Sequence, residues 1–135
     1  MKVNIEFENI DQDGEITRSK VPAIMENSGH DYRCVYMEDL SGDGNMTRST
    51  LTMSRFGLRI IRQGEVNTDF IYEPKLVHNT SYKTPYGTFP VSIETKEYRY
   101  TEGGDSIMTV NVKYYLTMSG EKPMAMGIKV RMTKA

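Results

Sequence analysis

The sequence predicts an all-β fold, a single antiparallel up-and-down β-barrel of about 8–10 strands. Apolar and polar residues alternate with a period of two along most of the 135-residue chain, as they do in half-buried strands. Turn signals rich in glycine, aspartate and proline recur at intervals of about 8–13 residues. The best helical candidate, Pro22 to Asn27, is too short to count against a fold made of strands.

Closure of the sheet follows from the number of strands. An open sheet of this size would have two free edges, and free edges invite aggregation. Because a barrel removes both edges, we expect one barrel domain over residues 1–135, with a two-sheet sandwich as the alternative.

The individual strands are placed by their alternation. In the first of them Val3, Ile5 and Phe7 share one face, while Asn4 and Glu6 lie on the other. The expected strands are Lys2–Ile10, Glu15–Met25, Tyr32–Leu40, Met46–Arg55, Phe56–Gln63, Glu65–Tyr72, Leu76–Lys83, Thr88–Tyr100, Ile107–Met118 and Met124–Thr133.

Residues that favour reversals separate these strands. Asp13-Gly14 is a hairpin signal, and Gly87 can adopt the positive φ that a tight turn after Pro85 needs. Pro22 cannot donate to a ladder, so it indicates an edge, a bulge or a bend in the second strand. Further turns are expected at Asn27–His30, Ser41–Asn45, Glu73–Lys75, Glu102–Asp105 and Ser119–Pro123.

Composition limits the classes of partner. The chain has 17 basic and 18 acidic residues and a net charge of −1, so it has no general attraction for nucleic acid or for an anionic membrane. Its N-terminus is not a signal peptide, and no window approaches the length of a membrane helix. Cys34 is the single cysteine, which excludes an internal disulfide and fits a reducing compartment. We therefore expect a cytoplasmic protein.

Two strands do not separate polar from apolar faces. Residues 46–55 and 76–83 carry hydroxyl or charged side chains on both faces, so polar groups enter the barrel whichever face turns inward. The interior is therefore expected to be apolar on one side and polar on the other. Such an interior can hold a small ligand, or it can be a filled core whose polar side chains satisfy one another.

The sequence leaves the orientation of one charged residue open. Arg62 has the same parity as Phe56, Leu58 and Ile60, but the adjacent pair Ile60-Ile61 does not settle which face of this strand is inward. If the Arg62 face is inward, a guanidinium lies inside the barrel and needs an anionic or carbonyl partner. Asp69 and Glu94 are the candidate protein partners, and the alternative is a carboxylate or phosphate of a ligand.

Catalysis has little support in the sequence. His78 shares parity with Thr80 and Tyr82 and could act as a base beside a carboxylate such as Glu94, which is the only route to a hydrolase. No nucleophile motif accompanies it. Two distant histidines and one cysteine offer little to a transition metal, so we expect no catalytic residue, metal or cofactor.

A set of spaced residues resembles a known family. The chain is similar to the YwiB-like proteins, small bacterial proteins of unknown function with a calycin-like, lipocalin-resembling β-barrel. The resemblance spans nearly the whole chain and implies that fold, but it implies no activity, ligand or catalytic residue. It rests on Arg62-Gln63-Gly64-Glu65-Val66, Phe70, Tyr82-Lys83-Thr84-Pro85-Tyr86-Gly87, Thr95 and Tyr114-Tyr115-Leu116.

Two functions are carried forward. The first is a binding module that takes a small amphipathic ligand into the barrel, with methionines and tyrosines as its wall. The second is a filled barrel whose outer surface binds a protein partner or a second copy of the chain. The residues expected to contact a ligand are Arg62, His78, Tyr82, Lys83 and Tyr86.

Overall fold

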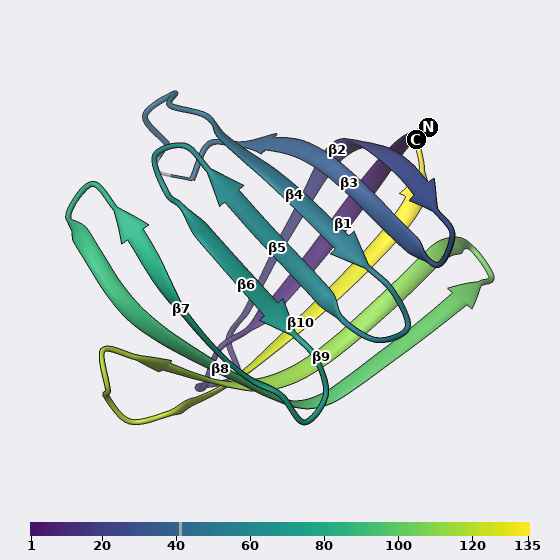
Figure 1. Ribbon diagram of the computed structural model, residues 1–135. Helices are drawn as coiled ribbons and strands as arrows, with labels where there is room; N and C mark the ends of the chain where they lie inside the picture. The colour runs from purple at the N-terminus through teal and green to yellow at the C-terminus, as the bar shows by residue number, and fades with distance from the viewer. Residues whose placement is uncertain (41) are drawn as a thin grey trace.

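The computed structural model describes residues 1–40 and 42–135, and these residues form ten strands and no helix (Figure 1). The strands are β1 (Lys2–Ile10), β2 (Ile16–Ser28), β3 (Asp31–Glu38), β4 (Thr47–Met53), β5 (Leu58–Gln63), β6 (Thr68–Tyr72), β7 (Val77–Thr84), β8 (Gly87–Gly103), β9 (Ser106–Met118) and β10 (Met124–Lys134). No helix in the described part of the chain is long and apolar enough to cross a membrane.

All the strands belong to one antiparallel sheet that curls into a nearly closed barrel (Figure 1). The order across the sheet is β6-β5-β4-β3-β2-β1-β10-β9-β8-β7, so neighbours in sequence are neighbours in space, and β1 also pairs with β10. The two outermost strands, β6 and β7, meet through the pairing of Asn67 with Lys83. The predicted all-β barrel is confirmed. The alternative, a two-sheet sandwich, does not agree with the single continuous sheet.

Strand β2 pairs with β1 along its first part and with β3 only near its end. It pairs with β1 over Ile16–Ile24 but with β3 over Ile24–Ser28 alone. Pro22 lies just before the ladder with β3 begins, where β2 has a partner on one side only. Of the three alternatives for Pro22, an edge is correct, because an edge strand does not need the missing N–H. The short helical candidate, Pro22 to Asn27, is part of strand β2.

The core fills the middle of the barrel. Alternate residues of β1, β9 and β10 are buried, as their sequence pattern predicts, and they pack against inward residues of β4, β5 and β8. Burial of each such side chain contributes about 1.5–3 kcal/mol. The fully buried apolar side chains include Val3, Ile5, Leu51, Met53, Leu58, Ile93, Met108, Val110, Val130 and Met132.

Several strand ends differ from expectation. β6 begins at Thr68 rather than Glu65, because Asn67 turns back on Gly64: its side-chain amide donates to the Gly64 carbonyl at 2.9 Å. β8 is longer than expected and contains a bulge between Thr95 and Glu97. Of the expected turn Ser41–Asn45, residue 41 lies outside the described residues, and the amides of Gly42 and Gly44 donate to the Asp39 carboxylate.

Candidate functional site

One end of the barrel interior is polar. Inward-facing residues lie opposite one another across four strands: Tyr36 of β3 faces Ser49 of β4, Ser49 faces Arg62 of β5, and Arg62 faces Thr68 of β6. One step further along, Glu38 of β3 faces Thr47 of β4. We call Tyr36, Glu38, Thr47, Ser49, Arg62 and Thr68 the polar row. This arrangement agrees with the expected interior, which has an apolar part and a polar part.

An ion pair lies at the centre of the polar row. The Arg62 Nε donates to Glu38 Oε2 at 3.4 Å, and the Ser49 hydroxyl donates to the same oxygen at 2.6 Å. The Arg62 and Glu38 side chains are 21% and 17% exposed, so both are largely sheltered. Among the described residues Glu38 is the single hydrogen-bond partner of this guanidinium. Its Nη groups are therefore left for water or a ligand.

The partner of Arg62 is not one of those expected. Asp69 faces Ile61 across the β5–β6 ladder, on the outer side, where Arg59 binds it at 2.8 and 2.6 Å. Glu94 also faces outward and pairs with Lys96 at 2.9 Å. Both carboxylates have the opposite parity from Arg62, so neither can reach the interior.

Three buried tyrosines lie near enough to the guanidinium for its charge to influence them. Tyr72 of β6 meets Tyr114 of β9 edge to face, with ring centroids 4.9 Å apart. Burial is the main cause that raises the pKa of Tyr36, Tyr72 and Tyr114, and the positive charge of Arg62 offsets part of each rise. All three phenols therefore stay protonated at neutral pH and can donate a hydrogen bond.

Threonine hydroxyls add unused polar capacity. In the described part of the chain the buried Oγ1 atoms of Thr47, Thr68 and Thr95 have no hydrogen-bond partner. A buried hydroxyl without a partner lowers the stability of the fold by about 1–3 kcal/mol. Such groups in a native fold therefore need an explanation. Two of the three belong to the polar row, next to Arg62 and Glu38 in the strand register.

A groove of about 440 Å³ runs along the seam where β6 meets β7 and reaches Arg62. Its lining comes from both faces of the sheet, because the strands are held together here at few points. The groove is lined by Ile61, Arg62, Gln63, Asn67, Thr68, Asp69, Thr80, Ser81 and Lys83.

Three kinds of contact close the seam. The backbones of Asn67 and Lys83 exchange two hydrogen bonds, of 2.9 and 3.0 Å. His78 Nε2 lies 2.9 Å from the Asp69 carbonyl oxygen, and because a carbonyl only accepts, Nε2 carries the proton. The rings of Phe70 and Tyr82 stack at 6.4 Å. The seam is thus far less extensively paired than the other strand junctions.

The five residues expected to contact a ligand are placed differently. Arg62 and Lys83 line the groove, while His78 and Tyr82 are half-buried on the inner side of β7 and hold the seam. Tyr86 is 95% exposed at the tip of the β7–β8 turn, and the structure does not bring it to the others.

The acid–base pair considered for a hydrolase does not form. His78 faces Ile93 of β8, which is buried, whereas Glu94 is the next residue and points to the opposite side of the sheet. The hypothesis that His78 and Glu94 act together was therefore wrong.

Sequence reasoning missed Glu38, Ser49 and Thr68. Ser49 was recognised as part of a mixed strand, but its contact with Glu38 depends on the β3–β4 register. The expected turn at Ser41–Asn45 predicts a reversal of the chain but does not by itself fix that register. Parity with Arg62, applied once the strand order is known, identifies Ser49 and Thr68.

The strand order, the near closure and the single polar end together define a small calycin-like barrel. Known proteins agree with this class. Residues 2–130 match the family described as "Domain of unknown function (DUF1934)", and the chain belongs to this family. Together with the YwiB crystal structure described next, this match confirms the resemblance to YwiB-like proteins.

A solved structure shows the same fold. The crystal structure of the YwiB protein from Bacillus subtilis is similar over 99% of this chain and 92% of that chain, with a TM-score of 0.83 and 12% sequence identity. At this identity the likeness concerns the fold alone. No curated protein matches the chain.

Proposed function

We propose that this protein binds a small amphipathic molecule that carries a carboxylate or a phosphate, and that the molecule enters through the groove at the β6–β7 seam. The observation that carries the proposal is the sheltered Arg62 guanidinium, which lines the groove while Glu38 uses only its Nε. The planar guanidinium can bind a second anion through its two Nη groups.

The surroundings of Arg62 supply the rest of an amphipathic site. The Thr80 side chain and the Lys83 ammonium offer polar contacts along the groove, while the Thr68 hydroxyl is buried opposite Arg62. The stacked rings of Phe70 and Tyr82, behind the seam, offer an apolar surface. Because the middle of the barrel is filled by the apolar core, the ligand occupies the polar end rather than the centre.

The test compares two arginine variants. Compounds that carry a carboxylate or a phosphate on an apolar body are screened by thermal shift, and those that stabilise the protein are measured by native mass spectrometry and titration. Arg62→Met should weaken their binding about tenfold or more, since an ionic hydrogen-bonded pair is lost. Arg48→Met is the matched control, because Arg48 lies on the neighbouring strand with an exposed side chain.

Two results would oppose the proposal. One is the absence of any compound that stabilises the wild-type protein. The other is a compound that binds Arg62→Met and the wild type equally well.

The filled middle of the barrel favours a second function, that of a protein-binding module. A barrel whose middle is filled by an apolar core can still act through its outer surface, and one part of that surface has the features of a peptide-binding edge.

A further inference from the structure

The first half of β2 is an unpaired edge. Its residues Ile16–Val21 pair with β1 on one side, and the ladder with β3 begins only at Ile24. The side chains of Ile16 to Lys20 are exposed on both faces of the strand. Along this stretch half of the backbone N–H and C=O groups point away from β1, where another strand could bind them.

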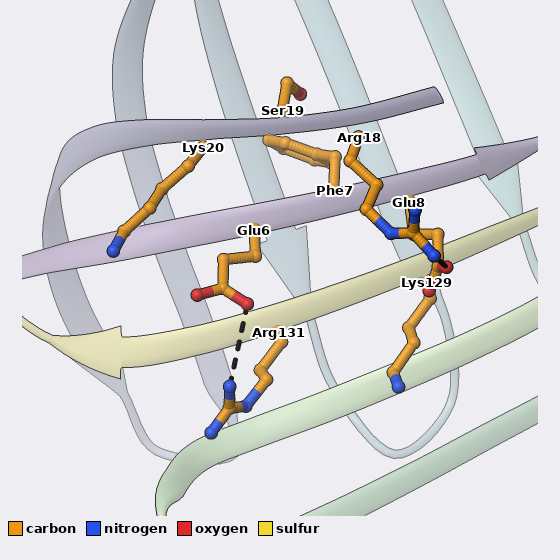
Figure 2. A pocket seen from close by; sticks show the side chains of 8 residues that line it. All are labelled: Glu6, Phe7, Glu8, Arg18, Ser19, Lys20, Lys129 and Arg131. Atoms are coloured by element: carbon orange, nitrogen blue, oxygen red, sulfur yellow. Dashed lines mark hydrogen bonds and ion pairs between the residues drawn. The ribbon is translucent and has the colours of Figure 1, made fainter. Parts of the chain in front are cut away.

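Positive side chains lie on this edge and on β10, two strands away, on the outer face of the sheet. In one row Glu6 of β1 lies between Lys20 of β2 and Arg131 of β10. In the next row Glu8 lies between Arg18 of β2 and Lys129 of β10. The six side chains border a groove of about 420 Å³ (Figure 2).

The cations in these rows outnumber the carboxylates. Glu6 pairs with Arg131 at 3.6 Å and Glu8 pairs with Arg18 at 3.0 Å. Lys20 and Lys129 have no ion-pair partner in the described part of the chain, and Figure 2 shows their ammonium groups at the border of the groove. The local excess of positive charge contrasts with the net charge of −1 of the whole chain.

We propose that the free edge of β2 binds an extended acidic segment of a partner protein as an added β-strand. Backbone hydrogen bonds to the edge would provide affinity, as in other cases of strand addition. Arg18 and Lys20 point to the same face, so they would lie opposite side chains two residues apart on the added strand, about 7 Å from each other. The segment therefore carries Asp or Glu at alternate positions.

A second copy of the chain fits this edge poorly. Pairing two β2 edges would bring Arg18 and Lys20 of one copy next to the same cations of the other, and like charges across a strand pair are destabilising. Pro22 removes one donor at the end of the edge and limits the added strand to about six residues.

Nucleic acid also fits poorly. Proteins that bind single strands usually combine cations with aromatic side chains on which bases stack. The outward residues of the two rows are all charged, and Phe7, the aromatic residue that lines the groove, is buried on the inner side. An acidic peptide needs no stacking surface.

The experiment uses a fluorescein-labelled peptide of alternating Thr and Glu, of about eight residues, and the full-length protein. Fluorescence anisotropy measures binding, and hydrogen exchange locates it. We expect Ile16–Val21 amides to become protected when the peptide binds. The double variant R18E/K20E should weaken binding about tenfold or more.

The matched control is R99E/K113E, which reverses two exposed cations of β8 and β9 on the same face of the sheet. Because it changes the net charge by the same amount, it should weaken binding by less than about twofold if the contact is local. If R18E/K20E does not fold, R18Q/K20Q replaces it, with about a threefold or greater loss expected. Arg62→Met should leave peptide binding unchanged, which separates this site from the proposed ligand site.

Four outcomes would overturn the proposal: no binding of the alternating peptide, equal loss in both double variants, protection located outside β2, or tighter binding of a single-stranded oligothymidine. The last of these would assign the face to nucleic acid instead.

Discussion

At the scale of single residues, the sheltered charges of the polar row have the clearest energetic consequence. Glu38 has Arg62 as its cationic partner and Ser49 as its hydroxyl donor. A carboxylate that is largely removed from water depends on such partners, because their loss leaves its desolvation uncompensated.

We predict that Arg62→Met lowers the free energy of unfolding by about 1–3 kcal/mol, since it leaves the Glu38 carboxylate without its cation. The double variant Glu38→Gln/Arg62→Met should recover part of the loss, because a neutral amide is less costly to shelter. Urea unfolding of the four proteins in this cycle measures both effects. If the double variant loses as much stability as the two single variants added together, or more, Glu38 and Arg62 do not stabilise each other as described here.

The buried thiol gives a prediction about pH. Burial raises the pKa of Cys34 from 9.0 to about 11, and its sulfur lies 3.5 Å from that of Met132. A thiol is neutral when protonated, so the folded state holds this proton more tightly than the unfolded state does. The stabilisation is fully present below pH 9 and is lost as the pH rises toward 11.

Accordingly, we expect Cys34 to react with an aromatic disulfide reagent at pH 8 at least about a hundredfold more slowly in the folded protein than in urea. Absorbance of the released thiolate follows the reaction. Fast modification of the folded protein at pH 8 would show that the thiol is accessible.

At the scale of elements, the seam between β6 and β7 is the weakest junction of the barrel. Two backbone hydrogen bonds, the His78 side chain and one aromatic stack hold it. Elements with few contacts open more readily than the core, and this seam also borders Arg62. The same feature that makes the closure incomplete therefore gives access to the polar row.

For this reason His78→Ala should increase hydrogen exchange at the Asn67 and Lys83 amides by about tenfold or less, while global stability falls by about 1 kcal/mol. Tyr86→Ala is the control, because that side chain is 95% exposed in the turn between β7 and β8. Equal exchange at these amides in His78→Ala and the wild type would mean that the histidine does not hold the strands together.

Sequence reasoning succeeded for features that depend on local pattern. Alternation placed the strands and grouped Arg62 with Leu58 and Ile60, while the β4–β5 ladder was needed to show that this face is the inner one. The Asp13-Gly14 turn follows from the conformations that glycine allows, and Pro22 limited its own position to an edge, a bulge or a bend, of which the structure shows the edge.

Features that depend on strand register could not be predicted in the same way. Glu38 lies 24 residues before Arg62 in the sequence, and only the pairing of β3, β4 and β5 brings the two together. Asp69 and Glu94 have the right charge but the wrong parity, and their place on the outer face depends on the ladders to β5 and β7. The free edge of β2 likewise depends on where β3 diverges.

At the scale of the whole molecule, pairing between residues distant in the chain joins the two halves of the sheet. β1 pairs with β10 over Val3–Ile10, and the two chain ends lie side by side (Figure 1). The Ala135 amide donates to the Lys2 carbonyl at 3.2 Å, and the Met1 amino group donates to the Met25 carbonyl at 3.1 Å. This pairing joins the two ends of the chain. We therefore expect all ten strands to unfold together in one transition.

The adjacency of the ends predicts that a circular permutant folds. Joining Ala135 to Met1 through a short glycine linker, and opening the chain in the exposed turn between Gly120 and Glu121, keeps every ladder of the sheet. The loss in stability should be about 1–2 kcal/mol, the scale of a change in loop closure. Circular dichroism and urea unfolding measure this loss.

A second permutant serves as the control. Opened between Gly127 and Ile128, inside β10, it should fail to fold, because it cuts a strand paired on both sides near the middle of the sheet. Equal stability of the two permutants would show that an unbroken β10 between β1 and β9 is not needed for the fold.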